Sequence, residues 1–271
     1  MVTQEQRKRQ LAREKFLRQQ QRRTAARRKA RVRNSVIASV LGVILVGSLT
    51  LYTTGVLKDD DKSNASAEAT PAPTPSAVKD PCAKPAAGSV KSQSWKKEPA
   101  MTIDKSAKYT MKLATTCGDI DVALKASAAP HTVNSFSFLA SKGYFDHTKC
   151  HRLTTNGIYV LQCGDPTGSG SGGPGYTIPD ENLKDKSLKA NVYPAGTVAM
   201  ANTGQAHTGG SQFFLVYQDS SLPPSYTPFG TVSAEGMTVL KKIAAAGEST
   251  GAGDGAPNAT VVINKATVTK S

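Results

Sequence analysis

From about residue 109 onward, the chain consists of short apolar runs separated by Gly, Pro and Asp. Strands this short, with turn residues between them, are typical of an antiparallel β-sandwich or barrel. The predicted strands are residues 109–115, 118–124, 157–163, 196–202, 211–217, 228–232 and 259–268. Two segments, 132–141 and 237–246, instead place apolar residues at helical spacing and end shortly before a glycine. The pattern therefore predicts a mainly β barrel with two helices.

A longer apolar stretch lies nearer the N-terminus. No residue between Arg33 and Lys58 is charged. A helix over residues 34–57 is long enough to cross a hydrocarbon core of about 30 Å, so we predict one transmembrane helix there. Five basic residues lie within 27–33, just before it, and three aspartates follow at 59–61. The positive-inside rule then places the N-terminus in the cytoplasm and everything after residue 57 outside the cell membrane.

A cleaved signal peptide is the alternative interpretation of this stretch. The apolar run is longer than the h-region of a signal peptide. The Ala-x-Ala sequence that could serve as a cleavage site, Ala65-Ser66-Ala67, lies well beyond the end of the run. We therefore predict an uncleaved, single-pass anchor.

The net formal charge of +14 is concentrated in residues 1–33, which hold 13 basic and 2 acidic residues. We interpret this segment as a cytoplasmic tail that sets the membrane topology. Nucleic-acid binding is the weaker alternative, because Phe16 is the only aromatic residue in the tail. Residues 58–100 are rich in Ala, Pro, Ser, Thr and Lys, which predicts an extended tether. Residues 101–271 are the predicted folded domain.

Four cysteines, Cys82, Cys117, Cys150 and Cys163, all follow the predicted transmembrane helix. An even number of cysteines in an oxidising compartment favours disulfides. Cys150 and Cys163 lie on consecutive strand-like runs and so fit a cross-strand pair, which would leave Cys82 to pair with Cys117. Four reduced thiols are the alternative. No metal site is predicted, because Cys150, His151 and Cys163 lack a fourth ligand at the usual spacing for zinc.

Arg152 is the only arginine after residue 33, in a region that uses 20 lysines. An ordinary surface charge would have been lysine by that usage, so we interpret Arg152 as a position that needs a guanidinium. The group is planar, always charged and rich in hydrogen-bond donors. A structural ion pair is the alternative interpretation.

The motifs around Arg152 resemble those of cyclophilins, the cyclosporin-binding class of peptidyl-prolyl isomerases. They occur in the family's order between about residue 109 and the C-terminus. The motifs are residues 150–152, 160–168, 172–176, 198–202, 210–214 and 229–230. Residues 222–229 resemble a bacterial branch of the family, which the predicted helix would anchor in the membrane. The resemblance implies a closed eight-stranded antiparallel barrel, capped by two helices, with the active groove on its outer face.

The resemblance also implies roles for individual residues. Arg152 would be the catalytic arginine, with Gln162 and Gln212 as its polar neighbours. Asn202 would hold the substrate through its backbone. The implied substrate pocket contains Tyr159, Val160, Ala201, Thr203, Phe214, Leu222 and Tyr226.

Two departures from the family pattern bear on ligand binding. Tyr226 stands where the family usually has His, and Ser221 where it has the Trp associated with cyclosporin binding. Weak cyclosporin binding is therefore expected. The segment between Arg152 and Gln162 is also two residues longer than the common pattern.

The implied activity is cis–trans isomerisation of X-Pro bonds in proteins that fold outside the membrane, by a monomer that needs no cofactor. A guanidinium aimed at the prolyl nitrogen would stabilise the twisted bond more than either planar isomer. One alternative is a proline-peptide binding module or holdase with little turnover. A second is a scaffold or nucleic-acid protein that works through residues 1–33.

Overall fold

The computed structural model of the protein describes residues 80–189 and 191–271. This part of the chain is mainly β and contains two α-helices, α2 (Pro130–Ser141) and α3 (Ala234–Ala245). Its strands are β1 (Tyr109–Thr115), β2 (Gly118–Leu124), β3 (Thr148–Lys149), β4 (Arg152–Thr154), β5 (Val160–Cys163), β6 (Val192–Tyr193), β7 (Thr197–Met200), β8 (Phe213–Val216), β9 (Ser220–Ser221), β10 (Pro228–Val232), β11 (Asp254–Gly255) and β12 (Val262–Lys270).

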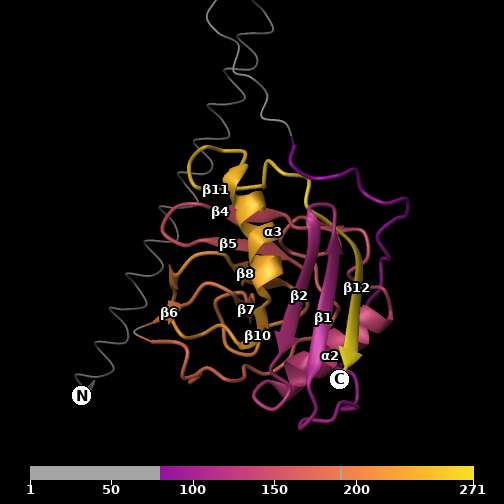
Figure 1. Ribbon diagram of the computed structural model, residues 1–271. Coiled ribbons are helices and arrows are strands. Elements are labelled where there is room, and N and C mark those ends of the chain that lie inside the picture. Colours follow the sequence, from indigo (N-terminus) through magenta and orange to yellow (C-terminus); the bar gives the residue numbers. More distant parts are fainter. Residues whose placement is uncertain (1–79, 190) are drawn as a thin grey trace, which may run out of the picture. The chain divides into compact units, whose positions relative to one another are not determined.

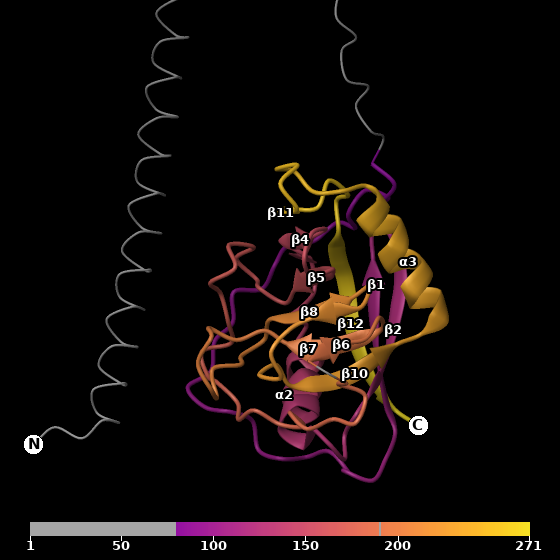
Figure 2. The ribbon, with the colours of Figure 1, turned by 90° about the vertical axis from the view of Figure 1, so that its left-hand side faces the viewer.

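Ten of the described strands form one antiparallel sheet in the order β11-β4-β5-β8-β7-β10-β2-β1-β12-β3. The sheet curls so that its two halves face each other. Strands β4, β5, β8, β7 and β10 run across the direction of the long strands β1, β2 and β12 (Figures 1 and 2). The remaining two strands, β6 and β9, pair separately. The expected mainly β architecture is confirmed.

The closed eight-stranded barrel that the resemblance implies is wrong in strand number and in closure. The sheet ends at β11 and β3, which do not pair with each other in the described chain. The reason is a break in one strand. The N–H of Cys150 donates to the carbonyl of Val261, whereas the next N–H, of His151, donates to the carbonyl of Gln162. The strand therefore splits into β3, which pairs with β12, and β4, which pairs with β5.

Both predicted helices are present, each beginning two or three residues earlier than expected. Helix α2 begins with Pro130, where a missing N–H costs nothing. Its free N–H groups at His131 and Thr132 donate to the carboxylate of Glu181, which comes from a distant loop. Helix α3 begins after Ser233, whose side chain accepts from the N–H of Gly236. Helix α2 packs against β12 and α3 against β2.

Strands β7 and β8 are buried on both faces, which explains why their sequences are almost continuously apolar. Inward side chains such as Phe213 join Phe136, Phe145 and Phe229 in the main core between the two halves of the sheet. Outward side chains form a second cluster. Its buried members are Val160, Tyr193, Ala199, Phe214 and Val216. The outer cluster is the floor on which the candidate site is built.

Residues 80–100, assigned to the tether by composition, pack against the domain. The N–H of Ala83 donates to the carbonyl of Thr116, and the N–H of Trp95 to that of Pro174. The Trp95 ring contacts Phe138 of α2, with centroids 5.1 Å apart. The part of the tether that the structure describes is therefore a strap along the domain.

Both disulfides that the cysteine spacing favoured are formed, Cys82 with Cys117 and Cys150 with Cys163. The first fastens the strap to the β1–β2 turn. The second joins the bend between β3 and β4 to the end of β5.

The basic tail, the transmembrane helix and the first half of the tether, all predicted within residues 1–79, lie outside the described residues. No helix within 80–189 and 191–271 is long and apolar enough to span a membrane.

Replacing Cys150 and Cys163 together by alanine should lower the free energy of unfolding by about 2–4 kcal/mol. The disulfide closes a loop with a sequence separation of 13, and such a loop restricts the unfolded chain by about that amount. Urea unfolding followed by circular dichroism measures the change. A loss below about 1 kcal/mol would show that the sheet alone holds this strand pair.

Candidate functional site

The candidate site begins with the pairing of β4 and β5. The register places Arg152 directly opposite Gln162, and Gln162 opposite Phe214 on β8. Phe214 in turn faces Ala199 on β7. Residues directly opposite each other on neighbouring strands point to the same face of a sheet. These four side chains therefore form one row across the outer face.

A line of hydrogen bonds runs along the polar end of this row. Arg152 Nη1 donates to Gln162 Oε1 at 3.1 Å, and Gln162 Nε2 donates to Gln212 Oε1 at 2.9 Å. Gln212 Nε2 then donates to the carbonyl of Gly172, also at 2.9 Å. The amide orientations of both glutamines are set by these contacts, because each amide uses its oxygen and its nitrogen once.

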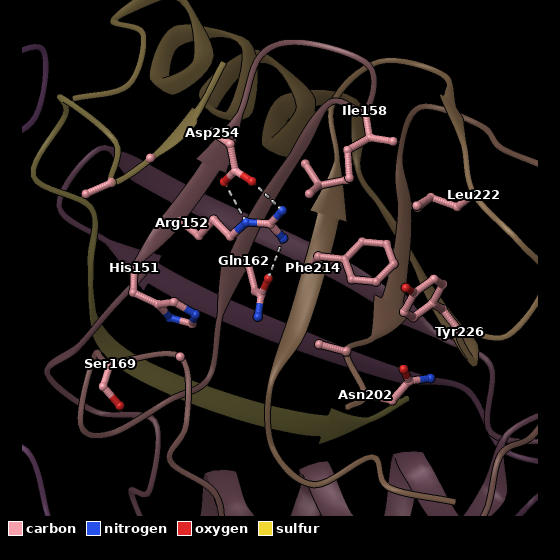
Figure 3. Close-up of a pocket in the computed structure, with 15 residues that line it drawn as sticks. His151, Arg152, Ile158, Gln162, Ser169, Asn202, Phe214, Leu222, Tyr226 and Asp254 are labelled. Atoms are coloured by element: carbon pink, nitrogen blue, oxygen red, sulfur yellow. Dashed lines mark hydrogen bonds and ion pairs between the residues drawn. The ribbon is translucent and has the colours of Figure 1, made fainter. Parts of the chain in front are cut away.

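Asp254 completes the line at the other end. Its Oδ1 and Oδ2 accept from Nε and Nη2 of Arg152 at 2.7 and 2.8 Å. The contact is bidentate, the geometry that guanidinium and carboxylate favour. The structural ion pair considered for Arg152 therefore exists, and it borders the hollow (Figure 3).

Side chains of this row line a hollow of about 530 Å³ on the outer face of the sheet. Figure 3 shows Arg152 and Gln162 on one side of it and Phe214, Leu222 and Tyr226 on the other. The hollow has an apolar floor and one cationic wall. Its lining includes eight of the predicted site residues, which are Arg152, Val160, Gln162, Ala201, Asn202, Phe214, Leu222 and Tyr226.

The apolar wall is held by aromatic packing. The rings of Phe214 and Tyr226 meet edge to face with centroids 5.5 Å apart. Behind them, the fully buried Tyr193 donates its hydroxyl to the carbonyl of Tyr226 at 2.8 Å. Burial raises the pKa of Tyr193 to about 12, so this hydroxyl stays protonated and keeps donating. The loop that carries Tyr226 is thereby fixed against the sheet.

The structure corrects the prediction for Tyr159. Tyr159 does not line the hollow; its ring packs on Tyr217 at 5.9 Å, and Ile158 takes the expected place. Side chains alternate along a strand, so Ile158, Val160 and Gln162 share the outer face. Tyr159 lies between Ile158 and Val160 on this extended segment, so its side chain points to the opposite face. Strict alternation in the sequence was the signal that could have found Ile158.

Thr203 and Gln212 line a second hollow of about 800 Å³, which adjoins the first. Ala201 and Asn202 border both hollows, and the glycine-rich segment 170–175 forms the far wall of the second. The side chain of Asn202 donates to the carbonyl of Ser225 and accepts from the N–H of Gly204. Among the described residues, none hydrogen-bonds to the backbone N–H or C=O of Asn202. An extended peptide could pair with these two groups.

Two buried carboxylates shape the loops around the hollows. Asp165 accepts from the N–H groups of Thr167 and Gly170, which folds the glycine-rich segment. Glu248 accepts from the N–H groups of Thr250 and Gly253, which folds the segment that carries Asp254. Sequence reasoning missed both carboxylates and Asp254. Nothing in the sequence relates Asp254 to an arginine 102 positions earlier.

The charges at the site are fixed near neutral pH. Hydrogen bonding to Asp254 raises the pKa of Arg152, and the same contact with Arg152 lowers the pKa of Asp254. Burial lowers the pKa of His151, which also lines the hollow, so its ring is neutral at pH 7. In the part of the chain that the structure describes, no group of three His, Cys, Asp or Glu side chains is placed to hold a metal ion. The site offers one fixed cation beside an apolar hollow.

The sequence model of the family described as "Cyclophilin type peptidyl-prolyl cis-trans isomerase/CLD" matches residues 110–268. The "Probable peptidyl-prolyl cis-trans isomerase B" of Mycobacterium leprae is 50% identical over 165 residues, which cover 58% of this chain and 56% of that protein. A peptidyl-prolyl cis-trans isomerase of Helicobacter pylori is 39% identical over 141 residues, 51% of this chain and 81% of that protein. The chain thus spans little more than half the length of its mycobacterial relative.

Solved structures of cyclophilin type isomerases are similar to this chain in fold. A cyclophilin type peptidyl-prolyl cis-trans isomerase of Cryptosporidium parvum superposes with a TM-score of 0.51 and 27% identity, over 60% of this chain and 99% of the other. A second structure of that protein, in the presence of the dipeptide Ala-Pro, gives a TM-score of 0.50 at 28% identity with the same coverage. With a family match that covers more than half of the chain, and with its motifs gathered around one groove, the protein belongs to the cyclophilin family of peptidyl-prolyl cis-trans isomerases.

Proposed function

We propose that the domain catalyses cis–trans isomerisation of X-Pro bonds in polypeptides that lie across the two hollows. The observation that carries the proposal is the guanidinium of Arg152 at the edge of an apolar hollow large enough for a prolyl ring. The Ala-Pro dipeptide named for the Cryptosporidium relative supports the choice of ligand.

The chemistry follows from the peptide bond itself. Resonance gives the C–N bond partial double-bond character and a rotation barrier of about 18–20 kcal/mol. At the twisted transition state the prolyl nitrogen is pyramidal and its lone pair is localised. An N–H of Arg152 can donate to that lone pair but has little to bind in either planar isomer. Because the contact is stronger in the transition state than in the ground state, it accelerates rotation.

The remaining residues hold the peptide while one bond turns. Phe214, Leu222 and Tyr226 would enclose the prolyl ring. The free backbone groups of Asn202 would pair with the chain that precedes it. The neighbouring hollow, lined by Thr203 and Gln212, would take an earlier side chain of the peptide. Holding both sides of the bond directs the motion to a single torsion, which lowers the entropic part of the barrier.

The proposed ligands are proline-containing segments of exported proteins, bound by a monomer without a cofactor. We expect weak cyclosporin binding, because Ser221 offers no indole beside Leu222. The proposed location follows from the sequence: residues 34–57 would span the cell membrane, and the domain would lie outside it, where slow prolyl steps limit the folding of exported chains.

Arg152→Ala should lower kcat/KM for prolyl peptides by about 10²–10³, the usual loss when one transition-state donor is removed. A protease-coupled assay with the purified full-length protein measures it. Lys112→Ala is the matched control, because Lys112 of β1 forms an exposed ion pair with Asp119 of β2, away from the groove, and its loss should leave activity unchanged. Peptide binding without turnover, equal in wild type and Arg152→Ala, would support the binding-module alternative instead.

The pH profile of kcat/KM should be flat from about pH 7 to about pH 9, because neither the guanidinium of Arg152 nor the ring of His151 changes its charge there. The pKa of Arg152 is raised, so the guanidinium keeps its charge. The pKa of His151 is lowered from 6.5, so its ring gains a proton only at more acidic pH. A stopped-flow assay over this range tests the profile. A rise or fall of kcat/KM with pH within this range would indicate a proton-transfer mechanism instead.

The proposed membrane topology predicts which lysines a membrane-impermeant amine reagent reaches. In intact cells it should label lysines of the domain, such as Lys105 and Lys186. Lys8, Lys15 and Lys29 should be labelled only after lysis, because they would lie in the cytoplasm. Mass spectrometry of the labelled peptides reads out both sets. Labelling of the N-terminal lysines in intact cells would overturn the topology.

A further inference from the structure

The segment after helix α3 crosses back over the edge of the sheet and brings a carboxylate to Arg152. Residues 254–255 form β11, which pairs with β4 so that Asp254 lies opposite Thr154 and Gly255 opposite Leu153. Arg152 is two residues before Thr154 on the same strand and therefore points to the same face. The long arginine side chain reaches diagonally to Asp254, as Figure 3 shows.

Hydrogen bonds and close packing restrict the conformation of residues 248–255. The buried Glu248 accepts from Thr250 N and Gly253 N at 2.6 and 2.8 Å. Gly253 has φ +91°, a conformation that favours glycine, and a Cβ there would collide with Asn156. A Cβ at Gly255 would collide with the carboxylate of Glu248. Asp254 is thus presented between two glycines that the local packing requires.

The contacts at the guanidinium leave a defined set of donors. A guanidinium has five N–H groups. Asp254 takes one on Nε and one on Nη2, and Gln162 takes one on Nη1. One N–H therefore remains on each terminal nitrogen. Three contacts from two sides fix the plane of the group, and with it the direction of the remaining N–H groups. In Figure 3 the two terminal nitrogens lie on the side of the guanidinium that faces Phe214.

We propose that Asp254 is a positioning residue, which orients the guanidinium of Arg152 so that a free N–H faces the bond that rotates. The proposal rests on the proposed isomerase activity. Asp254 would not touch the reacting atoms; it acts through Arg152. Gln162 shares the task from the opposite side, and its own amide is held by Gln212.

Two effects of the carboxylate oppose each other. It orients the guanidinium, which favours catalysis, and it offsets part of the positive charge, which weakens the remaining donors. The side chains of Arg152 and Asp254 are 38% and 56% exposed, so water screens the charge effect strongly. Orientation is not screened. Removing the carboxylate should therefore slow the reaction.

The test compares Asp254→Asn with wild type in the full-length protein. Asparagine keeps the shape of the side chain but replaces one acceptor oxygen by a donor nitrogen, so the bidentate contact is lost. We expect kcat/KM for a prolyl peptide to fall roughly 3- to 10-fold, through kcat, with KM nearly unchanged because the apolar wall is untouched. Asp119→Asn is the matched control, since it breaks an exposed ion pair far from the groove.

Two further measurements separate positioning from a general effect on the fold. In an Arg152→Ala background, Asp254→Asn should cause no additional loss, because its effect runs through the arginine. The Nε–H signal of Arg152 in a ¹⁵N spectrum should exchange with water faster in Asp254→Asn than in wild type. The spectrum reports on the contact whether or not the protein turns over substrate.

Each outcome bears on a different claim. Unchanged or raised kcat/KM in an active protein, or an equal loss in both backgrounds, would overturn the positioning role and leave the isomerase assignment standing. A wild-type protein without turnover would overturn the isomerase assignment. An Arg152 Nε–H signal that is unaffected by Asp254→Asn would then overturn the positioning role independently.

Discussion

The arrangement of the groove depends on the line of hydrogen bonds that runs from Asp254 through Arg152, Gln162 and Gln212 to the carbonyl of Gly172. It connects two loops that are far apart in sequence across strands β4 and β5. In this line the carboxylate of Asp254 and the carbonyl of Gly172 only accept, and the guanidinium only donates. Each glutamine between them accepts through its oxygen and donates through its nitrogen. The two surplus N–H groups of Arg152 lie at the edge of an apolar hollow, where they can donate to a bound ligand.

The apolar side of the groove has a different origin. Strands β7 and β8 carry apolar side chains on both faces, and the curled sheet buries only the inner face by itself. The outer face is covered by Tyr193 of β6, which precedes β7, and by Leu222 and Tyr226 of the loop that follows β9. This cover is incomplete over Phe214, whose neighbourhood forms the hollow. The second cluster thus stabilises the sheet and also supplies the surface that a prolyl ring would bury, at about 25 cal/mol per Å² of apolar area.

Covalent and polar restraints converge on the same region. The Cys150–Cys163 disulfide joins the two strands within two residues of Arg152 and one residue of Gln162. Buried Asp165 and Glu248 fold the loops at the two ends of the polar line. The strap contributes through the bond from Trp95 to the carbonyl of Pro174, at the rim of the second hollow. A site that works by orientation needs such rigid support, because it performs no bond-breaking chemistry that could compensate for a misplaced donor.

The sequence by itself determined the features that depend on local pattern. Alternating and continuous apolar runs predicted most of the long strands, helical spacing predicted both helices, and the single arginine in a lysine-using region identified Arg152. Short strands such as β3, β4 and β11 were not predictable, because two or three residues carry no periodic signal and exist only through their partners. The same reason explains the remaining differences. The sheet is open because the two halves of the broken strand pair with different neighbours. Ile158 rather than Tyr159 faces the hollow because side chains alternate along the extended chain. Asp254 reaches Arg152 only through the register between β11 and β4. These are choices of partner between segments up to 102 positions apart, and hydrogen bonding across a sheet settles them only when the whole chain has folded.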